Sequence, residues 1–169
     1  KDTEIINNVF TNCYWMYYPV KQLTSDFTFV SNRMVNCRSM YSSSGGYNEL
    51  PNAEIAYNTF ITEFGEPFLT KEHDGLHENV FIHHNTVVGS TNFVRVARKV
   101  RSPWRPKIYD NLIVLSAGSA LFQEDENEFY KKDGEVPAYS SFKTDGGAAF
   151  TNNVYMADNF DAGNALSLE

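Results

Sequence analysis

Three histidines are the first residues in the sequence whose type and spacing suggest chemistry. His77, His83 and His84 lie close together in the stretch HENVFIHHNTVVGS, and imidazole nitrogens are common metal ligands. The spacing lacks the i, i+4 pairing of a zinc protease helix and any cysteine-based zinc pattern. Neighbouring strand residues also face opposite sides, so we expect His83 and His84 to point apart. A structural role is therefore favoured over a metal site, and no metal ligand is assigned.

A basic segment, residues 95–107, is the second feature with chemical meaning. Its sequence, RVARKVRSPWRPK, contains no acidic residue. Guanidinium groups bind phosphate, sulfate or carboxylate in a bidentate manner, and an indole ring can stack on a sugar. We assign substrate binding to the residues Arg95, Lys99, Arg101, Trp104 and Arg105. A solvated turn whose cations pair with neighbouring acidic loops explains the segment equally well.

An acidic cluster provides the third candidate chemistry. Glu124, Asp125, Glu126 and Glu128 are suited to calcium by residue type. The alternating spacing and central glycine of an EF-hand loop are absent, so a solvated acidic loop is favoured. No cofactor is assigned with certainty, and Ca²⁺ remains the alternative.

Composition limits the classes of partner. The chain has 169 residues, a formal net charge of −7 and 15% aromatic residues, which is typical of a globular, strand-rich domain. The negative charge disfavours nucleic acid as a partner. No apolar run approaches the roughly 18 residues that span a membrane, so we expect no membrane partner either.

A repeated pattern indicates the elements that position these residues. An asparagine recurs at steps of 24, 26, 27, 26 and 42 residues, with an apolar residue three positions before it and another two positions after it. The six copies are centred on Asn8, Asn32, Asn58, Asn85, Asn111 and Asn153. We interpret each copy as a strand, a corner at which the asparagine takes the left-handed conformation, and a second strand. Side-chain amides of stacked asparagines would then hydrogen-bond along the stack.

A third strand follows each of the later corners. The motifs FGEPFLT, STNFVRV, AGSALFQ and AGNALSL lie at corresponding places after Asn58, Asn85, Asn111 and Asn153. Three short strands in about 25 residues predict an all-β solenoid, a right-handed parallel β-helix of about six coils with an asparagine ladder.

The corner motif, as in IAYNTF of residues 55–60, resembles that of the pectate lyase-like and chondroitinase B-like β-helix superfamily. The resemblance implies a secreted, periplasmic or cell-surface protein whose substrate lies along the sheet of third strands. It also implies an acidic polysaccharide as partner. The alternative is a non-catalytic carbohydrate-binding module, adhesin or tailspike-type β-helix.

The resemblance further implies candidate catalytic residues. Chondroitinase B-like lyases use a lysine and an arginine on adjacent coils, and Lys71 and Arg98 each lie thirteen residues after a ladder asparagine. Lys71 or His73 would act as the base in β-elimination, and Arg95 or Arg98 would neutralise the uronate carboxylate. The Arg-His-Gly run of those lyases is missing, and Lys71 stands at the arginine position. A lyase is favoured over a glycoside hydrolase because paired acidic residues at the groove are not evident.

The remaining expectations concern chain organisation. We expect a single β-helix segment over residues 1–169 with an inserted loop at residues 124–147. End caps are not evident, so the segment is interpreted as part of a longer solenoid, or as one capped by another subunit. Cys13 and Cys37 each follow a ladder asparagine by five residues, so they should stack on adjacent coils, as a disulfide or as a reduced pair.

Overall fold

The structure, a computed structural model, describes residues 2–17, 26–43, 52–70, 79–96, 107–116, 120–124 and 149–156. Every regular element within these ranges is a β-strand. In the same ranges no helix has the length and apolar character needed to cross a membrane.

The strands form three parallel sheets. Sheet 1 contains, in spatial order, β1 (Thr3–Ile6), β4 (Asp26–Val30), β7 (Asn52–Ala56), β10 (Asn79–His83), β13 (Lys107–Tyr109) and β16 (Ala149–Thr151). Sheet 2 contains β2 (Val9–Thr11), β5 (Arg33–Val35), β8 (Thr59–Ile61), β11 (Thr86–Val88), β14 (Leu112–Val114) and β17 (Val154–Met156). Sheet 3 contains β3 (Trp15–Tyr17), β6 (Ser39–Ser43), β9 (Phe68–Thr70), β12 (Asn92–Val96) and β15 (Ala120–Glu124).

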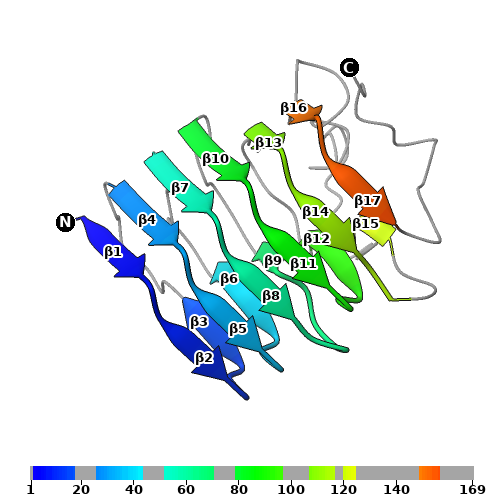
Figure 1. Ribbon diagram of the computed structural model, residues 1–169, viewed down its shortest axis with the longest axis horizontal. Coiled ribbons are helices and arrows are strands. Elements are labelled where there is room, and N and C mark those ends of the chain that lie inside the picture. Colours follow the sequence, from blue (N-terminus) through cyan, green and yellow to red (C-terminus); the bar gives the residue numbers. More distant parts are fainter. Residues whose placement is uncertain are drawn as a thin grey trace, which may run out of the picture.

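Each coil contributes one strand to each sheet before the chain moves to the next coil. The spatial order in every sheet therefore follows the order along the chain (Figure 1). This arrangement is a parallel β-helix solenoid, so the predicted fold class is confirmed. Strand β15 ends at Glu124, which is the first residue of the inserted loop that the sequence suggested. The rest of that loop and the AGNALSL motif lie outside the described residues.

The predicted asparagine ladder runs along the corner between sheets 1 and 2. The Oδ1 atom of each ladder residue after Asn8 accepts the backbone N–H of the ladder residue one coil earlier, at 2.8 to 3.0 Å. The side-chain amide of Asn58 also donates to the backbone oxygen of Phe29 in the preceding coil, at 2.8 Å. Buried polar groups require such partners, so the ladder joins successive coils where the backbone turns.

The left-handed residue at this corner is not the ladder asparagine, which corrects the sequence-based expectation. Positive φ angles occur instead at the preceding positions, Asn7, Ser31, Tyr57, His84, Asp110 and Asn152, with values between 53° and 58°. The ladder side chain must point inward to reach the neighbouring coil. The residue before it therefore makes the reversal, with its own side chain outside the ladder.

The core consists of in-register columns of apolar side chains. Phe29, Ile55, Ile82 and Ile108 form one column from sheet 1, and Met34, Phe60, Val87 and Ile113 form another from sheet 2; all are at most 2% exposed. These are the columns predicted three residues before and two residues after each ladder asparagine. Burying each such side chain contributes about 1.5–3 kcal/mol.

A second corner, between sheets 2 and 3, requires special backbone conformations. Asn12 and Asn36 have φ angles of 56° and 54°, and Gly89 has 81° at the corresponding place. Gly65 has a φ angle of 95°, and a Cβ atom there would lie 2.2 Å from the backbone oxygen of Arg38. The glycine of the FGEPFLT motif is therefore needed for close approach of two coils. The AGSALFQ and AGNALSL motifs also contain a glycine each, Gly118 and Gly163, and both lie outside the described residues.

The two cysteines occupy neighbouring coils as free thiols. The backbone N–H of Arg38 donates to the carbonyl of Cys13 at 3.0 Å, which places the two coils in register at this point. Burial raises the pKa of the Cys37 thiol, and the adjacent Cys13 also affects it. The predicted stacking is thus confirmed in its reduced form.

Candidate functional site

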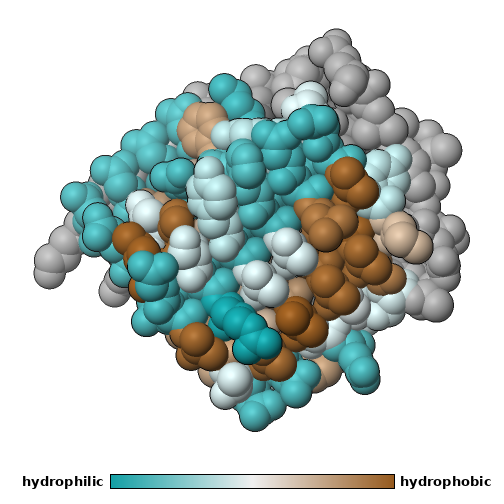
Figure 2. Space-filling view, in the orientation of Figure 1, coloured by the Kyte–Doolittle hydropathy of each residue, from teal (hydrophilic) through white to brown (hydrophobic). Residues whose placement is uncertain are grey.

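The outer face of sheet 1 carries three columns of outward-facing residues at fixed distances before the ladder asparagine. Six residues before it stand Asp26, Asn52 and Asn79. Four residues before it stand Thr28, Glu54, Phe81 and Lys107, and two residues before it stand Val30, Ala56, His83 and Tyr109. Figure 2 shows this face as largely hydrophilic, in contrast to the apolar band over sheet 2.

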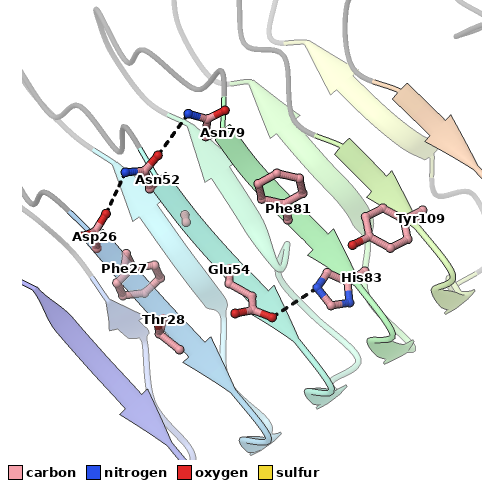
Figure 3. Close-up of a pocket in the computed structure, with 10 residues that line it drawn as sticks. Asp26, Phe27, Thr28, Asn52, Glu54, Asn79, Phe81, His83 and Tyr109 are labelled. Carbon is pink, nitrogen blue, oxygen red and sulfur yellow. Dashed lines mark hydrogen bonds and ion pairs between the residues drawn. The ribbon is translucent and has the colours of Figure 1, made fainter.

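A depression with a volume of about 300 Å³ lies on this face and is open to solvent. It is lined by Asp26, Phe27, Thr28, Asn52, Ala53, Glu54, Asn79, Phe81, His83 and Tyr109. The lining residues come from β4, β7, β10 and β13, four successive coils of the solenoid (Figure 3). A depression that crosses several coils suits an extended ligand better than a compact one.

One side of the depression is a row of hydrogen-bonded polar side chains. The Asn52 amide donates to Asp26 Oδ1 at 2.7 Å, and the Asn79 amide donates to Asn52 Oδ1 at 3.1 Å (Figure 3). All three side chains are exposed. Their remaining donors and acceptors therefore face solvent, where sugar hydroxyl groups could replace water.

Phe81 presents an aromatic ring in the middle of the depression. It is only partly buried, although it is a large apolar side chain on an outer face. The ammonium group of Lys107 lies 5.1 Å from the centre of its ring. This cation–π contact holds the last residue of the basic segment at the edge of the depression.

His83 and His84 contact each other through their imidazole rings. The Nδ1 atoms of the two rings are 2.9 Å apart. His83 Nε2 lies 3.5 Å from Glu54 Oε1, and His84 Nε2 lies 3.9 Å from Asp110 Oδ2. Each imidazole thus has a carboxylate at one nitrogen and the other imidazole at its second nitrogen.

Two tyrosines fix the planes of these imidazole rings. Tyr109 stacks on His83 with ring centres 4.8 Å apart and planes 9° apart. Tyr57 stacks on His84 with ring centres 4.9 Å apart and planes 26° apart. The stacks explain why His83 is only 9% exposed although it is on the outer face.

The expectation that His83 and His84 point apart was wrong for a local reason. β10 ends at His83, and His84 has a φ angle of 53°. Alternation of side chains holds only within an extended strand. The left-handed residue turns the chain, so the two rings converge.

Burial and charge affect the titrating groups of this site. Burial lowers the pKa of His83 and the adjacent His84 lowers it further, whereas the Glu54 carboxylate opposes both effects. Burial raises the pKa of Tyr109, and the carboxylates of Asp110 and Glu54 act in the same direction. A His83 imidazole that favours its neutral form can act as a base or as a metal ligand. In the described part of the chain, no three histidine, cysteine, aspartate or glutamate side chains converge as a metal cage.

A second depression, of about 470 Å³, lies at the corner between sheets 2 and 3 and is lined by Asn12, Cys13, Tyr14, Asn36, Glu63 and Phe64. It is larger than the first. It lacks a comparable set of interacting ionisable groups among its lining residues, so the outer face of sheet 1 is the better candidate.

Most residues that the sequence suggested for catalysis and binding lie outside the described residues. These are Lys71, His73, Arg98, Lys99, Arg101, Trp104 and Arg105. Arg95 is in β12, with its backbone paired to Leu69 and Gln123 of the adjacent strands.

The strand register of sheet 3 bears on the predicted pairing of Lys71 with Arg98. That pairing was based on equal counts from the ladder asparagine. The last described pair between β9 and β12 is Thr70 with Val96. Thr70 lies twelve residues after Asn58, whereas Val96 lies eleven residues after Asn85. Equal counts from the ladder therefore do not mark in-register residues at this edge. The turn before β9 contains one residue more than the turn before β12.

Sequence reasoning missed the Glu54, Phe81, His83 and Tyr109 arrangement, although a signal was present. The inward columns were found by counting from the ladder asparagine. The same counting at two, four and six residues before it identifies the outer columns of sheet 1.

Comparison of the chain with known protein families, with curated proteins and with solved structures found no match.

Proposed function

We propose that the protein binds polysaccharide along the outer face of its β-helix. The observation that carries this proposal is the depression that crosses four coils, with Phe81 in its middle and the row of Asp26, Asn52 and Asn79 beside it. An aromatic ring can stack on the C–H face of a sugar, while amides and carboxylates bind its hydroxyl groups. Parallel strands repeat about every 4.8 Å, so such groups recur along the direction in which a linear glycan would extend.

The favoured ligand class is an acidic polysaccharide. Asp26, Glu54 and Asp110 oppose an anionic ligand at this face. The favourable charge would come from the basic segment, whose last residue, Lys107, lies over Phe81. The corner motif supports this class through its resemblance to pectate lyase-like proteins, and with it a secreted, periplasmic or cell-surface location.

A binding experiment tests the site. The full chain is titrated with alginate, pectate and chondroitin, and with neutral glucans, by isothermal calorimetry. Phe81→Ala should weaken binding about tenfold, which corresponds to about 1.4 kcal/mol. Phe64→Ala is the matched control, because Phe64 is a half-exposed aromatic residue of the other depression. Equal effects of the two substitutions would refute the site, and tighter binding of neutral glucans would refute the acidic class.

Cleavage by β-elimination is a further step of this proposal. Lys71 or His73 would remove the proton next to the uronate carboxylate, and Arg98 would stabilise the charge that develops. The ultraviolet absorbance of an unsaturated uronate product would reveal cleavage. Its loss in Lys71→Ala and Arg98→Ala would support a lyase, whereas binding without product would support an adhesin or carbohydrate-binding module.

A further inference from the structure

The convergence of two imidazoles on the outer face of sheet 1 has a geometry that suits a metal ion. The His83 and His84 Nδ1 atoms are 2.9 Å apart. Two imidazole nitrogens at about 2.05 Å from one metal would be about 2.9 Å apart at a right angle, and about 3.3 Å apart at a tetrahedral angle. The observed separation matches adjacent positions of a square-planar or octahedral ion.

The groups behind the imidazoles match the surroundings of metal-binding histidines. A histidine ligand usually directs its second nitrogen at a carboxylate, which fixes its tautomer and makes it a better donor. Glu54 lies on that side of His83, 3.5 Å from its Nε2 atom (Figure 3), and Asp110 lies on that side of His84 at the longer distance of 3.9 Å. The arrangement is therefore duplicated, with one carboxylate for each imidazole.

The site is also held in place before any ion binds. Tyr109 and Tyr57 stack on the two imidazole rings, so the rings lose little freedom on binding. His83 is nearly buried, whereas the His84 side chain is 44% exposed. An ion could therefore enter the site from solvent on the His84 side.

We propose that His83 and His84 bind a divalent transition-metal ion through their Nδ1 atoms, with Ni²⁺ or Cu²⁺ preferred. A right-angle nitrogen pair favours these ions over zinc, which prefers tetrahedral coordination. Two protein ligands leave further positions for water or for a ligand oxygen. A uronate carboxylate could occupy such a position and so overcome the negative charge of Glu54 and Asp110; this last step rests on the proposed function, whereas metal binding does not.

Metal titration of the full chain tests the proposal. The protein is titrated with NiCl₂ by calorimetry, and its Cu²⁺ complex is examined by electron paramagnetic resonance for coupling to two imidazole nitrogens. The variants use residues that other coils carry in the same columns. His84→Asn matches Asn7 and Asn152, which have the same left-handed conformation, and His83→Thr matches Thr151.

Each substitution should weaken Ni²⁺ binding roughly a hundredfold or more and should remove one nitrogen coupling from the Cu²⁺ spectrum. His77→Gln is the control and should leave both measurements unchanged. Circular dichroism confirms that each variant is folded. Equal Ni²⁺ affinity in the wild type and the His83→Thr/His84→Asn double variant would overturn the proposal and leave a proton shared between the rings as the explanation of their contact. If Ni²⁺ binding were lost in the His77→Gln variant but kept in the His83 and His84 variants, the proposal would be overturned as well.

Discussion

At the scale of single residues, position relative to the ladder corner decides what each side chain does. Four of the ladder asparagines are buried and join two coils, namely Asn32, Asn58, Asn85 and Asn111, while the residue before each is left-handed. The asparagine ladder is therefore a structural device, and the variable residue before it is free to carry function. His84 illustrates this freedom, because its coil uses the left-handed position to bring an imidazole against His83.

The ladder makes a prediction at this scale. Asn85→Ala should lower the free energy of unfolding by about 3 kcal/mol, because buried partners lose their hydrogen bonds. Asn85 Oδ1 accepts the backbone N–H of Asn58 at 3.0 Å, and its amide donates to the Ile55 carbonyl at 2.8 Å. Urea unfolding measures the change.

Asn8→Ala is the control for this prediction. Asn8 belongs to the same ladder but is exposed, so solvent can satisfy the groups that the substitution frees. Its cost should be about 1 kcal/mol or less. Equal costs at the two positions would contradict the view that burial makes the ladder important.

At the scale of strands, alternation divides each sheet into an inner face that folds the protein and an outer face that is available for binding. In sheet 1 the inner columns contain Ile55 and Ile82, and the outer columns contain Glu54, Phe81 and His83. In sheet 2 the outer face carries a group of apolar side chains, with Leu112, Val154 and Met156 at least 43% exposed. Residues on the inner face of a strand are therefore constrained by folding, whereas residues on its outer face are available for binding.

A pair of charge substitutions tests this division. Ile82→Asp should prevent folding, because Ile82 is fully buried and an unpaired buried charge costs several kcal/mol. Val154→Asp introduces the same charge at a side chain that is 65% exposed, and it should leave the folded state intact. Circular dichroism and thermal unfolding distinguish the two. A folded Ile82→Asp variant would show that this column is not the core.

At the scale of the whole molecule, the solenoid is a stack in which each coil pairs with its neighbours. Strand pairing joins each described coil to the next one along the chain. Stability should then be close to a sum of contributions from coils and from contacts between neighbouring coils.

Removing one coil tests this additivity. Deletion of residues 59–85 joins Asn58 directly to Thr86, which occupies the same register as Thr59. Because the ladder step here is 27 residues, every column stays in place, and the shortened chain should fold with reduced stability. Deletion of residues 59–84 shifts the register by one residue and exposes the inner columns, so that chain should not fold. Circular dichroism compares the two chains, and equal behaviour would refute the additive stack.

The sequence by itself determined the solenoid, its coil boundaries, the asparagine ladder and the inward columns. In a parallel stack, a fixed offset from one repeated residue becomes a column in space, so Ile55, Ile82 and Ile108 could be aligned by counting. Tertiary structure decided what depends on backbone direction at the corners and on the length of each turn. The left-handed φ of His84 brought it against His83, and one additional residue before β9 shifted Thr70 onto Val96. The packing of Glu54, Asp110 and the tyrosines around those imidazoles arises from different coils, so only the stacked chain brings these groups together.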